Sequence, residues 1–327
     1  MAPKFASAAL ATLLLSAPVS TVTATAQEAF PSKPIKIVLP IPTGTALDIV
    51  TRIVSDDMSK RLGQPVVVEA RPGAGGLLAA QAVMSAPADG YTLLGGASSL
   101  FTILPAQKEN LPIDLSRDFT QIGLIVGRGV MYVGVSPKLG VSTFKDFVTL
   151  AKSKPGQIVV GTNAAGTLPH YAALALVKKG GVPINVVPYS QGGSLAAIND
   201  IMGGRAHAVV EASFGIRGHV QSGDVTLVGA MSSEREPEYR NVPLVSETIP
   251  GLTAVGFMSL AARSETPRPI ILRLNEALRQ ALDSASVKQR FAEHGVPIRN
   301  LTPEQANAFV ASEQKIWLPL VKELEGK

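Results

Sequence analysis

The 327-residue sequence contains no cysteine. A disulfide, a thiolate zinc site, an iron–sulfur cluster and a cysteine nucleophile are therefore all excluded. Histidine is also scarce, and the four positions are not spaced as paired metal ligands. They are His170, His207, His219 and His294. We expect neither a metal site nor a cofactor.

Aromatic residues make up only 5% of the chain. Proteins that bind single-stranded nucleic acids stack bases on aromatic side chains, so this class is disfavoured. The net charge of +5 comes from scattered residues, and the longest basic runs are pairs such as Lys178-Lys179. Such a diffuse excess favours small anionic ligands or plain solubility over a nucleic-acid partner. No stretch after the N-terminal segment is apolar over about 18 residues, so the mature chain is predicted to be soluble.

The N-terminal segment has the pattern of a secretory signal peptide. Lys4 supplies a basic start, residues 8–15 form a short apolar stretch, and Ala24-Thr25-Ala26 is a small-x-small cleavage site. We predict cleavage between Ala26 and Gln27 and export to a bacterial periplasm. An uncleaved anchor is the alternative, although the apolar stretch is short for a membrane-spanning helix.

The mature chain alternates strand patterns with helical patterns in two blocks, which predicts two α/β lobes with largely parallel sheets. In the first block, strands are expected at 35–39, 66–68 and 91–94, with helices at 48–62 and 77–84. In the second block, strands are expected at 158–160, 184–187, 208–210 and 226–228, with helices at 144–152, 169–178 and 195–202. Further helices are expected at 267–282 and 303–324.

Two extended stretches, 129–135 and 255–260, lack following helices of the same kind, and we expect them to cross between the lobes. The predicted organisation is therefore discontinuous. Residues 1–26 are the signal peptide, 27–128 with 255–327 form lobe 1, and 129–254 form lobe 2.

Glycine-rich and hydroxyl-rich loops join strands to helices in the first block. The amides at a helix N-terminus are unpaired and carry partial positive charge, so such loops can hold an anion. The alternatives are that Asp48 merely caps its helix and that residues 95–99, which include Ser98-Ser99, form an ordinary turn. Neither the nucleotide P-loop pattern nor the GxGxxG pattern fits. The candidate ligand-binding residues are Thr43, Gly44, Thr45, Ala46, Leu47, Asp48, Gly73, Ala74, Gly75, Gly76, Ser98 and Ser99.

The second block has similar loops, with Gly166 and Thr167 before one helix, Tyr189 before another and Glu211 after a strand. Thr167 is a candidate ligand donor or helix N-cap. His170 is interpreted as structural, because a lone histidine without a partner is usually so. No GxSxG motif and no nucleophile–base pair are present, so no catalytic residue is nominated.

Several segments together have the pattern of one known family. The sequence resembles the periplasmic solute-binding proteins of tripartite tricarboxylate transporters, the Bug family, over essentially the whole mature chain. The segments that carry the resemblance are 34–38, 40–50, 62–69, 71–76 and 88–94, followed by Asp118-Phe119, Pro188-Tyr189 and Arg273-Leu274-Asn275.

This resemblance implies a type II periplasmic-binding-protein fold, with two α/β lobes, a ligand cleft between them and two linking strands. It implies that amides of loops 40–48 and 71–76, helped by ordered waters, hold one ligand carboxylate. By the same resemblance, hydroxyl loops at Ser98-Ser99 and Gly166-Thr167 are expected to complete the site, and Tyr189 and Glu211 are expected to face the distal end of the ligand.

Four positions depart from the family pattern. Thr45 and Leu47 replace small residues of the first loop, Glu211 stands where aspartate is usual, and Ser190 replaces a lysine. Less positive charge and more apolar bulk favour a mono- or dicarboxylate, possibly aromatic, with an apolar body.

The sequence therefore predicts a monomeric receptor that delivers an organic acid to the membrane subunits of a tripartite tricarboxylate-type transporter. Two alternatives stay open at this point. The chain could present its ligand to a membrane sensor kinase, or, with less support, it could be an exported enzyme that acts on organic acids.

Overall fold

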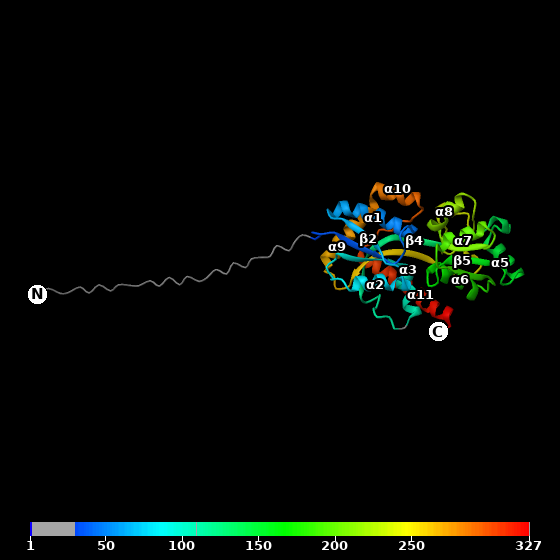
Figure 1. The fold of residues 1–327 in the computed structure, drawn as a ribbon, viewed down its shortest axis with the longest axis horizontal. Helices are drawn as coiled ribbons and strands as arrows, with labels where there is room; N and C mark the ends of the chain where they lie inside the picture. Colours follow the sequence, from blue (N-terminus) through cyan, green and yellow to red (C-terminus); the bar gives the residue numbers. More distant parts are fainter. Residues whose placement is uncertain (2–29, 109, 327) are drawn as a thin grey trace.

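The computed structural model describes Met1, residues 30–108 and residues 110–326, which form two α/β bodies side by side (Figure 1). The predicted signal peptide and its cleavage point lie outside the described residues. Within the described ranges, no helix has both the length and the apolar character needed to span a membrane.

Lobe 1 is built on a mixed sheet covered by helices on both faces. Strands β1, β2 and β3 are parallel, and β9 is antiparallel to β3 and β4. The strand order is β2 (Val66–Ala70), β1 (Ile35–Leu39), β3 (Thr92–Ala97), β9 (Val255–Arg263) and β4 (Phe119–Val135). One face carries α1 (Ala46–Leu62), α9 (Arg268–Asp283) and α10 (Ala285–Glu293). The other carries α2 (Leu77–Met84), α3 (Ser98–Thr102) and α4 (Leu104–Gln107).

Neighbouring residues of β1 show how the sequence produces these two layers. Ile35, Ile37 and Leu39 point into the core beneath α1 and α9, while Val38 packs in the core beneath α2. A strand places successive side chains on opposite faces, so a largely apolar strand is buried on both sides.

Lobe 2 repeats this plan with its own sheet. Strand β7 runs antiparallel to β4, and β5 and β6 run parallel to β7. The strands are β7 (Ala208–Ala212), β5 (Val159–Asn163), β6 (Asn185–Tyr189) and β8 (Thr226–Ala230), which pairs with β4. The helices are α5 (Phe144–Ser153), α6 (Leu168–Lys178), α7 (Gly193–Met202) and α8 (Ser213–Gln221).

Strand β4 connects the two sheets. Its residues 119–130 pair with β9, whereas residues 131–135 pair with β7 in lobe 2. The chain returns to lobe 1 through β9. The predicted two-lobed α/β fold with two crossing strands is therefore confirmed, although β4 begins ten residues before the predicted stretch.

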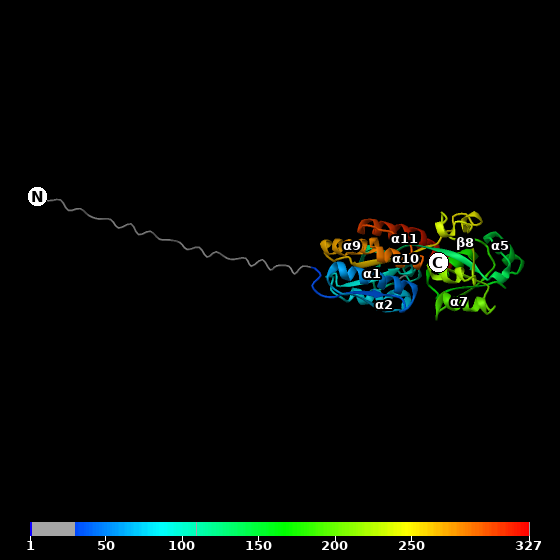
Figure 2. The same ribbon diagram turned by 90° about the horizontal axis from the view of Figure 1, so that it is seen from above.

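The last helix, α11 (Pro303–Glu325), touches the cores of both lobes. Val310 packs in the lobe 1 core, whereas Trp317, Val321 and Leu324 pack with α6 in the lobe 2 core. Figure 2 shows α11 in red along the upper side of the molecule. A Thr302–Gln305 capping box begins this helix, and Gly326 in the left-handed conformation ends it.

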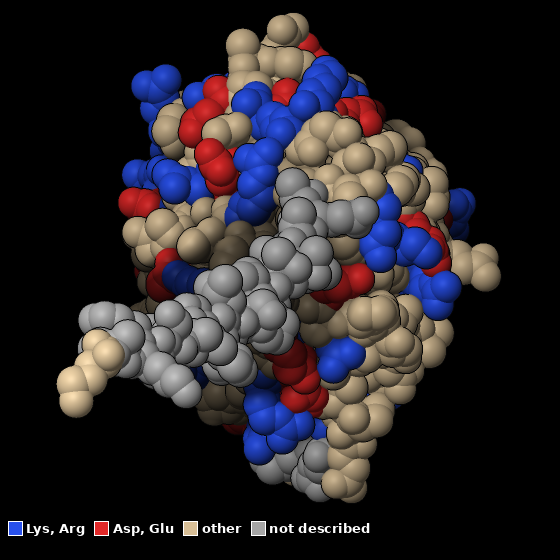
Figure 3. Space-filling model, turned by 90° about the vertical axis from the view of Figure 1, so that its left-hand side faces the viewer, with Lys and Arg blue, Asp and Glu red and all other residues tan. Residues whose placement is uncertain are grey.

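Charged side chains of both signs are interspersed on the visible part of the end face of lobe 1 (Figure 3). The described residues include exposed ion pairs such as Lys33–Asp89 and Lys36–Glu69. Exposed pairs of this kind contribute at most about 1 kcal/mol each, so packing of the two cores carries the stability.

Candidate functional site

The strand directions bring the candidate loops of the two lobes face to face. Strands β1, β2 and β3 run in the direction of β4, toward lobe 2, because β9 is antiparallel to both β3 and β4. Strands β5, β6 and β7 run against β4, toward lobe 1. Ligands of α/β sheets bind at the carboxyl ends of the strands. The loops that follow these six strands are therefore the candidate site.

The first loop, between β1 and α1, is held by a buried acid. Asp48 is 1% exposed, and it accepts a hydrogen bond from the Gly44 amide at 2.9 Å and three from the Arg52 guanidinium at 2.9–3.1 Å. Burial alone would raise the pKa of Asp48, but the hydrogen bonds from Arg52 and Gly44 and the charge of Arg52 lower it. Asp48 therefore fixes a loop amide.

The start of α1 contradicts the hypothesis that Asp48 is the N-cap of this helix. Thr45, rather than Asp48, is the N-cap of α1, and its hydroxyl donates to the Pro42 carbonyl at 2.9 Å. Asp48 is the third residue of the helix, and its carboxylate reaches back to the amide of Gly44, one residue before the N-cap. Thr43, Gly44 and Thr45 are exposed, whereas Leu47 is partly buried against the lobe 1 core.

The second loop has an unusual backbone. Gly73, Ala74, Gly75 and Gly76 all have positive φ, of 134°, 49°, 69° and 100°. Only glycine adopts this region without penalty, which explains the glycines and makes Ala74 a strained residue. Consecutive amides in turn conformations form a concavity that attracts anions. A Cβ at Gly76 would lie 3.0 Å from the Pro40 Cβ and 3.1 Å from the Leu100 Cδ1. The first, second and third loops of lobe 1 therefore converge.

The third loop is shorter than the sequence suggested. Residues 95–97, interpreted as a possible turn, are the end of β3, and Ser98 begins α3 directly. Close packing explains the two glycines, because a Cβ at Gly95 would lie 2.3 Å from Leu39 and one at Gly96 2.2 Å from Phe101. Ser98 is buried and Ser99 is partly exposed.

In lobe 2, two predicted side chains already have partners within the protein. Thr167 is the N-cap of α6, but its hydroxyl donates to the Ala164 carbonyl at 2.7 Å. The Tyr189 hydroxyl donates to Asp200 at 2.7 Å, and the pKa of Tyr189 is raised to about 12 by burial and by this acid. Gly166, with φ +86°, lies beside Gln107 of α4, which brings the β5–α6 loop next to lobe 1.

Glu211 is the buried acid of lobe 2, at 6% exposure. Its Oε1 accepts the Ala212 amide at 2.7 Å, and its Oε2 accepts the Asn163 Nδ2 at 2.5 Å. Ser194 adds a side-chain hydrogen bond. Burial raises the pKa of Glu211, although the three hydrogen bonds oppose this shift.

Asn163, at the end of β5, was missed by the sequence analysis. Its Oδ1 accepts the Ser194 amide at 2.7 Å while its Nδ2 donates to Glu211. Because a backbone amide only donates and needs an acceptor, these partners also fix the orientation of the Asn163 amide. Its position as the last strand residue before a glycine-rich loop is the signal that could have identified it.

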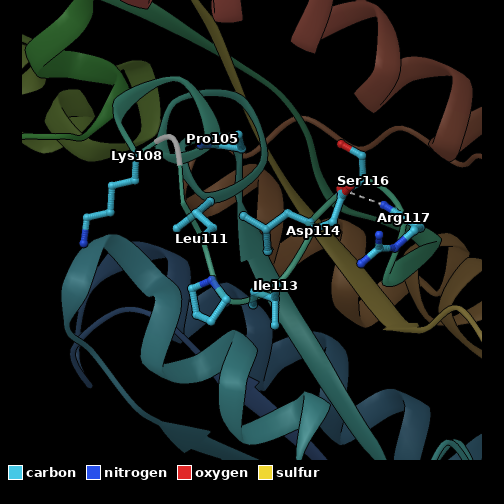
Figure 4. Close-up of a pocket in the computed structure, with 9 residues that line it drawn as sticks. Pro105, Lys108, Leu111, Ile113, Asp114, Ser116 and Arg117 are labelled. Carbon is cyan, nitrogen blue, oxygen red and sulfur yellow. Dashed lines mark hydrogen bonds between the residues drawn. The ribbon is translucent and has the colours of Figure 1, made fainter.

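Two surface hollows lie away from these loops. One of about 380 Å³ is lined by Pro105, Lys108 and residues 111–117 (Figure 4), and the other lies between the end of α1 and the start of β2. In the first, the Asp114 carboxylate accepts the amides of Ser116 and Arg117 at 3.0 and 3.1 Å. This acid closes a surface turn, and neither hollow contains a predicted site residue.

The two facing sets of strand-end loops define a two-lobed receptor of the periplasmic-binding-protein class. Residues 50–325 match the model of the tripartite tricarboxylate transporter family receptor. The chain is 31% identical over 324 residues to BugT of Bordetella pertussis, covering 97% of this chain and 95% of that protein. The chain therefore belongs to this receptor family.

Solved structures agree with this assignment. A periplasmic transporter protein matches with a TM-score of 0.81 and 28% identity, covering 90% of this chain and 98% of that one. MatC from Rhodopseudomonas palustris, solved with bound malate, matches with a TM-score of 0.78 and 27% identity, covering 89% and 100%.

Proposed function

We propose that this protein is a periplasmic receptor that captures a small organic acid between its lobes and delivers it to a tripartite tricarboxylate-type membrane transporter. Lobe 1 comprises residues 27–128 and 255–327, and lobe 2 comprises residues 129–254. The signal peptide ends at Ala26. The mechanism is capture and release: the lobes rotate about β4 and β9, and the closed form docks on the transporter.

The observation that carries this proposal is the run of four left-handed residues, Gly73 to Gly76, packed against Pro40 and Leu100. Backbone amides in such a run are fixed before the ligand arrives, so little conformational entropy is lost on binding. A carboxylate would add charge-assisted hydrogen bonds of about 1.5–3 kcal/mol each. Three or four of them sum to about 4.5–12 kcal/mol before association costs, and a micromolar complex needs roughly 8 kcal/mol, so these bonds supply much of the binding free energy. The malate in MatC, a relative of similar fold, supports the ligand class.

Asp48 fits this role although it is an acid in the first loop. Its carboxylate is buried and paired with Arg52, so it holds the loop without repelling a ligand. The roles of Ser98, Ser99, Gly166 and Thr167 in completing the site belong to the same proposal, as does the placement of Tyr189 at its distal end.

A thermal-shift screen of the exported, purified protein against organic acids tests the proposal, with hits confirmed by calorimetry. A micromolar ligand at 1 mM stabilises the native state by about 4 kcal/mol. We expect the melting temperature to rise with carboxylates alone, and we expect the ligand to be recovered unchanged. No shift with any carboxylate, or chemical conversion of a hit, would overturn it. The mass of the exported chain reports the cleavage point.

A further inference from the structure

The end of lobe 2 that lies farthest from lobe 1 carries an excess of lysine. Figures 1 and 2 both place α5 at this end. Residues 136–158, which contain α5, and residues 178–185, which run from the end of α6 to the start of β6, hold six lysines and one acid. All six lysines are exposed, and together we call them the lysine surface. They are Lys138, Lys145, Lys152, Lys154, Lys178 and Lys179.

Backbone hydrogen bonds bring the two segments together. The Gly156 amide donates to the Pro183 carbonyl at 2.8 Å, and the Asn185 amide donates to the Ile158 carbonyl at 2.8 Å. Strands β5 and β6 run toward lobe 1, so the loops that precede them both lie at the far end of lobe 2. The lysines of the two segments therefore belong to one surface.

Helix α5 presents part of this surface because it is amphipathic. Phe144 and Phe147 are buried in the lobe 2 core. Lys145 and Lys152 are seven residues apart, so they lie on nearly the same face of the helix, away from the core. The packing of α5 thus turns two positive charges outward together.

Most of these charges have no acidic partner. Among the residues that the structure describes, Lys179 alone of the six forms a salt bridge, to Glu323 at 3.3 Å. The one acid of the two segments, Asp146, accepts a hydrogen bond from the Thr143 hydroxyl at the start of α5. The positive charges of the lysine surface therefore add up rather than cancel.

The opposite end of the molecule is different. At the lobe 1 end, Lys33 lies 3.5 Å from Asp89, and Lys36 lies 2.7 Å from Glu69. Charges of both signs are interspersed on the visible part of that face (Figure 3). Basic charge is therefore concentrated at one end of the protein, which an evenly distributed net charge would not produce.

The chemistry of the lysine surface favours a membrane over a protein partner. Within the described ranges, none of the large apolar side chains that are exposed lies in residues 136–158 or 178–185. Protein interfaces are centred on aromatic, methionine and arginine side chains, and lysine is depleted there. A polar surface of flexible lysines suits a fluid layer of anionic phospholipid headgroups instead.

We propose that the lysine surface binds anionic phospholipid headgroups and so concentrates the receptor at the membrane that contains its transporter. The candidate ligand loops follow β5, β6 and β7 at the other end of these strands, so a ligand and a membrane can be bound together. The membrane contact is independent of the ligand, whereas its use in delivery rests on the proposed function.

Sedimentation of the exported, purified protein with vesicles tests the proposal. Vesicles of phosphatidylethanolamine and phosphatidylglycerol are compared with neutral vesicles of phosphatidylcholine. Each lysine near an anionic surface raises the partition coefficient about 5-fold. Binding to the anionic vesicles should be at least about 10-fold stronger than binding to the neutral ones. It should fall as salt is added, because ions screen exposed charges.

Lys152→Gln combined with Lys154→Gln removes two charges of the lysine surface and should weaken binding to anionic vesicles at least about 10-fold. Lys33→Gln combined with Lys36→Gln is the matched control. It makes the same change of net charge at the lobe 1 end and should change vesicle binding less than about 3-fold.

A second double variant, Lys138→Gln with Lys178→Gln, changes two other members of the lysine surface and should weaken binding by a similar factor. No loss in either lobe 2 variant overturns the proposal, as does an equal loss in the lobe 1 control. Absence of wild-type binding to anionic vesicles at low salt also overturns it. Binding to polyglutamate without binding to vesicles would indicate an acidic protein partner and overturn the membrane assignment.

Calorimetry with an organic acid separates this inference from the proposed function. All three double variants should bind the acid as the wild-type protein does. Loss of vesicle binding with intact acid binding would leave the receptor function standing. Failure of every acid to bind, with vesicle binding intact, would overturn the proposed function and leave the membrane contact.

Discussion

The two lobes each bury one acid beside their strand-end loops, and the two acids are held in opposite ways. Asp48 in lobe 1 is paired with the Arg52 guanidinium, whereas Glu211 in lobe 2 is held by neutral donors alone. Burial would raise the pKa of either acid. The partners of Asp48 reverse that shift and lower its pKa, while the pKa of Glu211 remains raised.

This difference explains how one fold can divide a binding task between two similar halves. A carboxylate that has its own cation can shape a loop and still leave neighbouring amides available to a ligand. A carboxylate without a cation accepts hydrogen bonds from neighbouring amides, so those amides are no longer available to a ligand. When it is ionised, it also makes the local electrostatic potential negative. Under the proposed function, the Gly73–Gly76 loop of lobe 1 receives the ligand carboxylate, whereas the Ala212 amide of lobe 2 is already used by Glu211.

The largest expected effect comes from placing a negative charge in lobe 1. Gly75→Asp adds a carboxylate within the left-handed run, where a Cβ would lie 3.3 Å from Leu104. Binding of the best carboxylate should weaken at least about 100-fold, or about 2.8 kcal/mol. Calorimetry of the purified variant measures this loss.

Gly75→Asn is the matched control for that experiment, because asparagine has nearly the same shape and tolerates positive φ better than most residues. The asparagine variant should retain at least ten times more affinity than the aspartate variant. Equal affinities would mean that backbone strain, rather than charge, disrupts the loop. Retained affinity in both would remove Gly75 from the binding site.

A smaller effect is expected on stability, with opposite pH dependence for the two acids. The pKa of Asp48 is lowered in the folded state. The ionised carboxylate therefore stabilises the fold at pH values above 3.8, the ordinary pKa of aspartate, and this contribution is lost as the pH falls through the folded-state pKa. Asp48→Asn should therefore cost about 1–2 kcal/mol at pH 7, by loss of the charged hydrogen bonds, and less at pH 3.

The pH dependence of stability that we expect from Glu211 has the opposite sign. Its folded-state pKa is raised above the ordinary value of 4.5, so the folded protein retains the proton more strongly than the unfolded chain. The wild-type protein should lose stability relative to Glu211→Gln as the pH rises from 4.5 through the folded-state pKa. Urea denaturation of the three proteins from pH 3 to 8 measures both differences. Parallel pH profiles for the two variants would contradict the contrast between the lobes.

The sequence predicted most of the fold because periodicity and family resemblance depend on many residues at once. Helices α2 and α9 lie within a residue of their expected bounds. The first half of β4 was missed because residues 119–128 include Gly123 and Gly127 and read as irregular. Pairing with β9 makes this segment a strand, which shows that strand formation depends on the neighbouring strand.

The candidate site was harder to predict because its contacts join residues far apart in the chain. Glycines at 95 and 96 indicated a turn, but they lie in β3, where they permit close packing against Leu39 and Phe101. Asn163 and Glu211 lie near the ends of β5 and β7, Ser194 follows β6, and no local spacing relates the three residues. The family resemblance indicated Glu211, while only the structure identified the donors that hold it.

The smallest expected effect concerns Thr167, whose hydroxyl proton is already donated to Ala164. If Thr167 instead donated to the ligand, Thr167→Ala would weaken binding by about 1–2 kcal/mol, or roughly 5- to 30-fold. The observed hydrogen bond predicts a loss below about 3-fold, together with slight destabilisation of the loop that precedes α6. Thr167→Ser keeps the hydroxyl and should restore both affinity and stability. A loss of 10-fold or more in the alanine variant, with unchanged urea stability, would mean that the hydroxyl turns from Ala164 to the ligand. Lobe 2 would then contribute a donor to the anionic end, which would weaken the division of roles between the lobes.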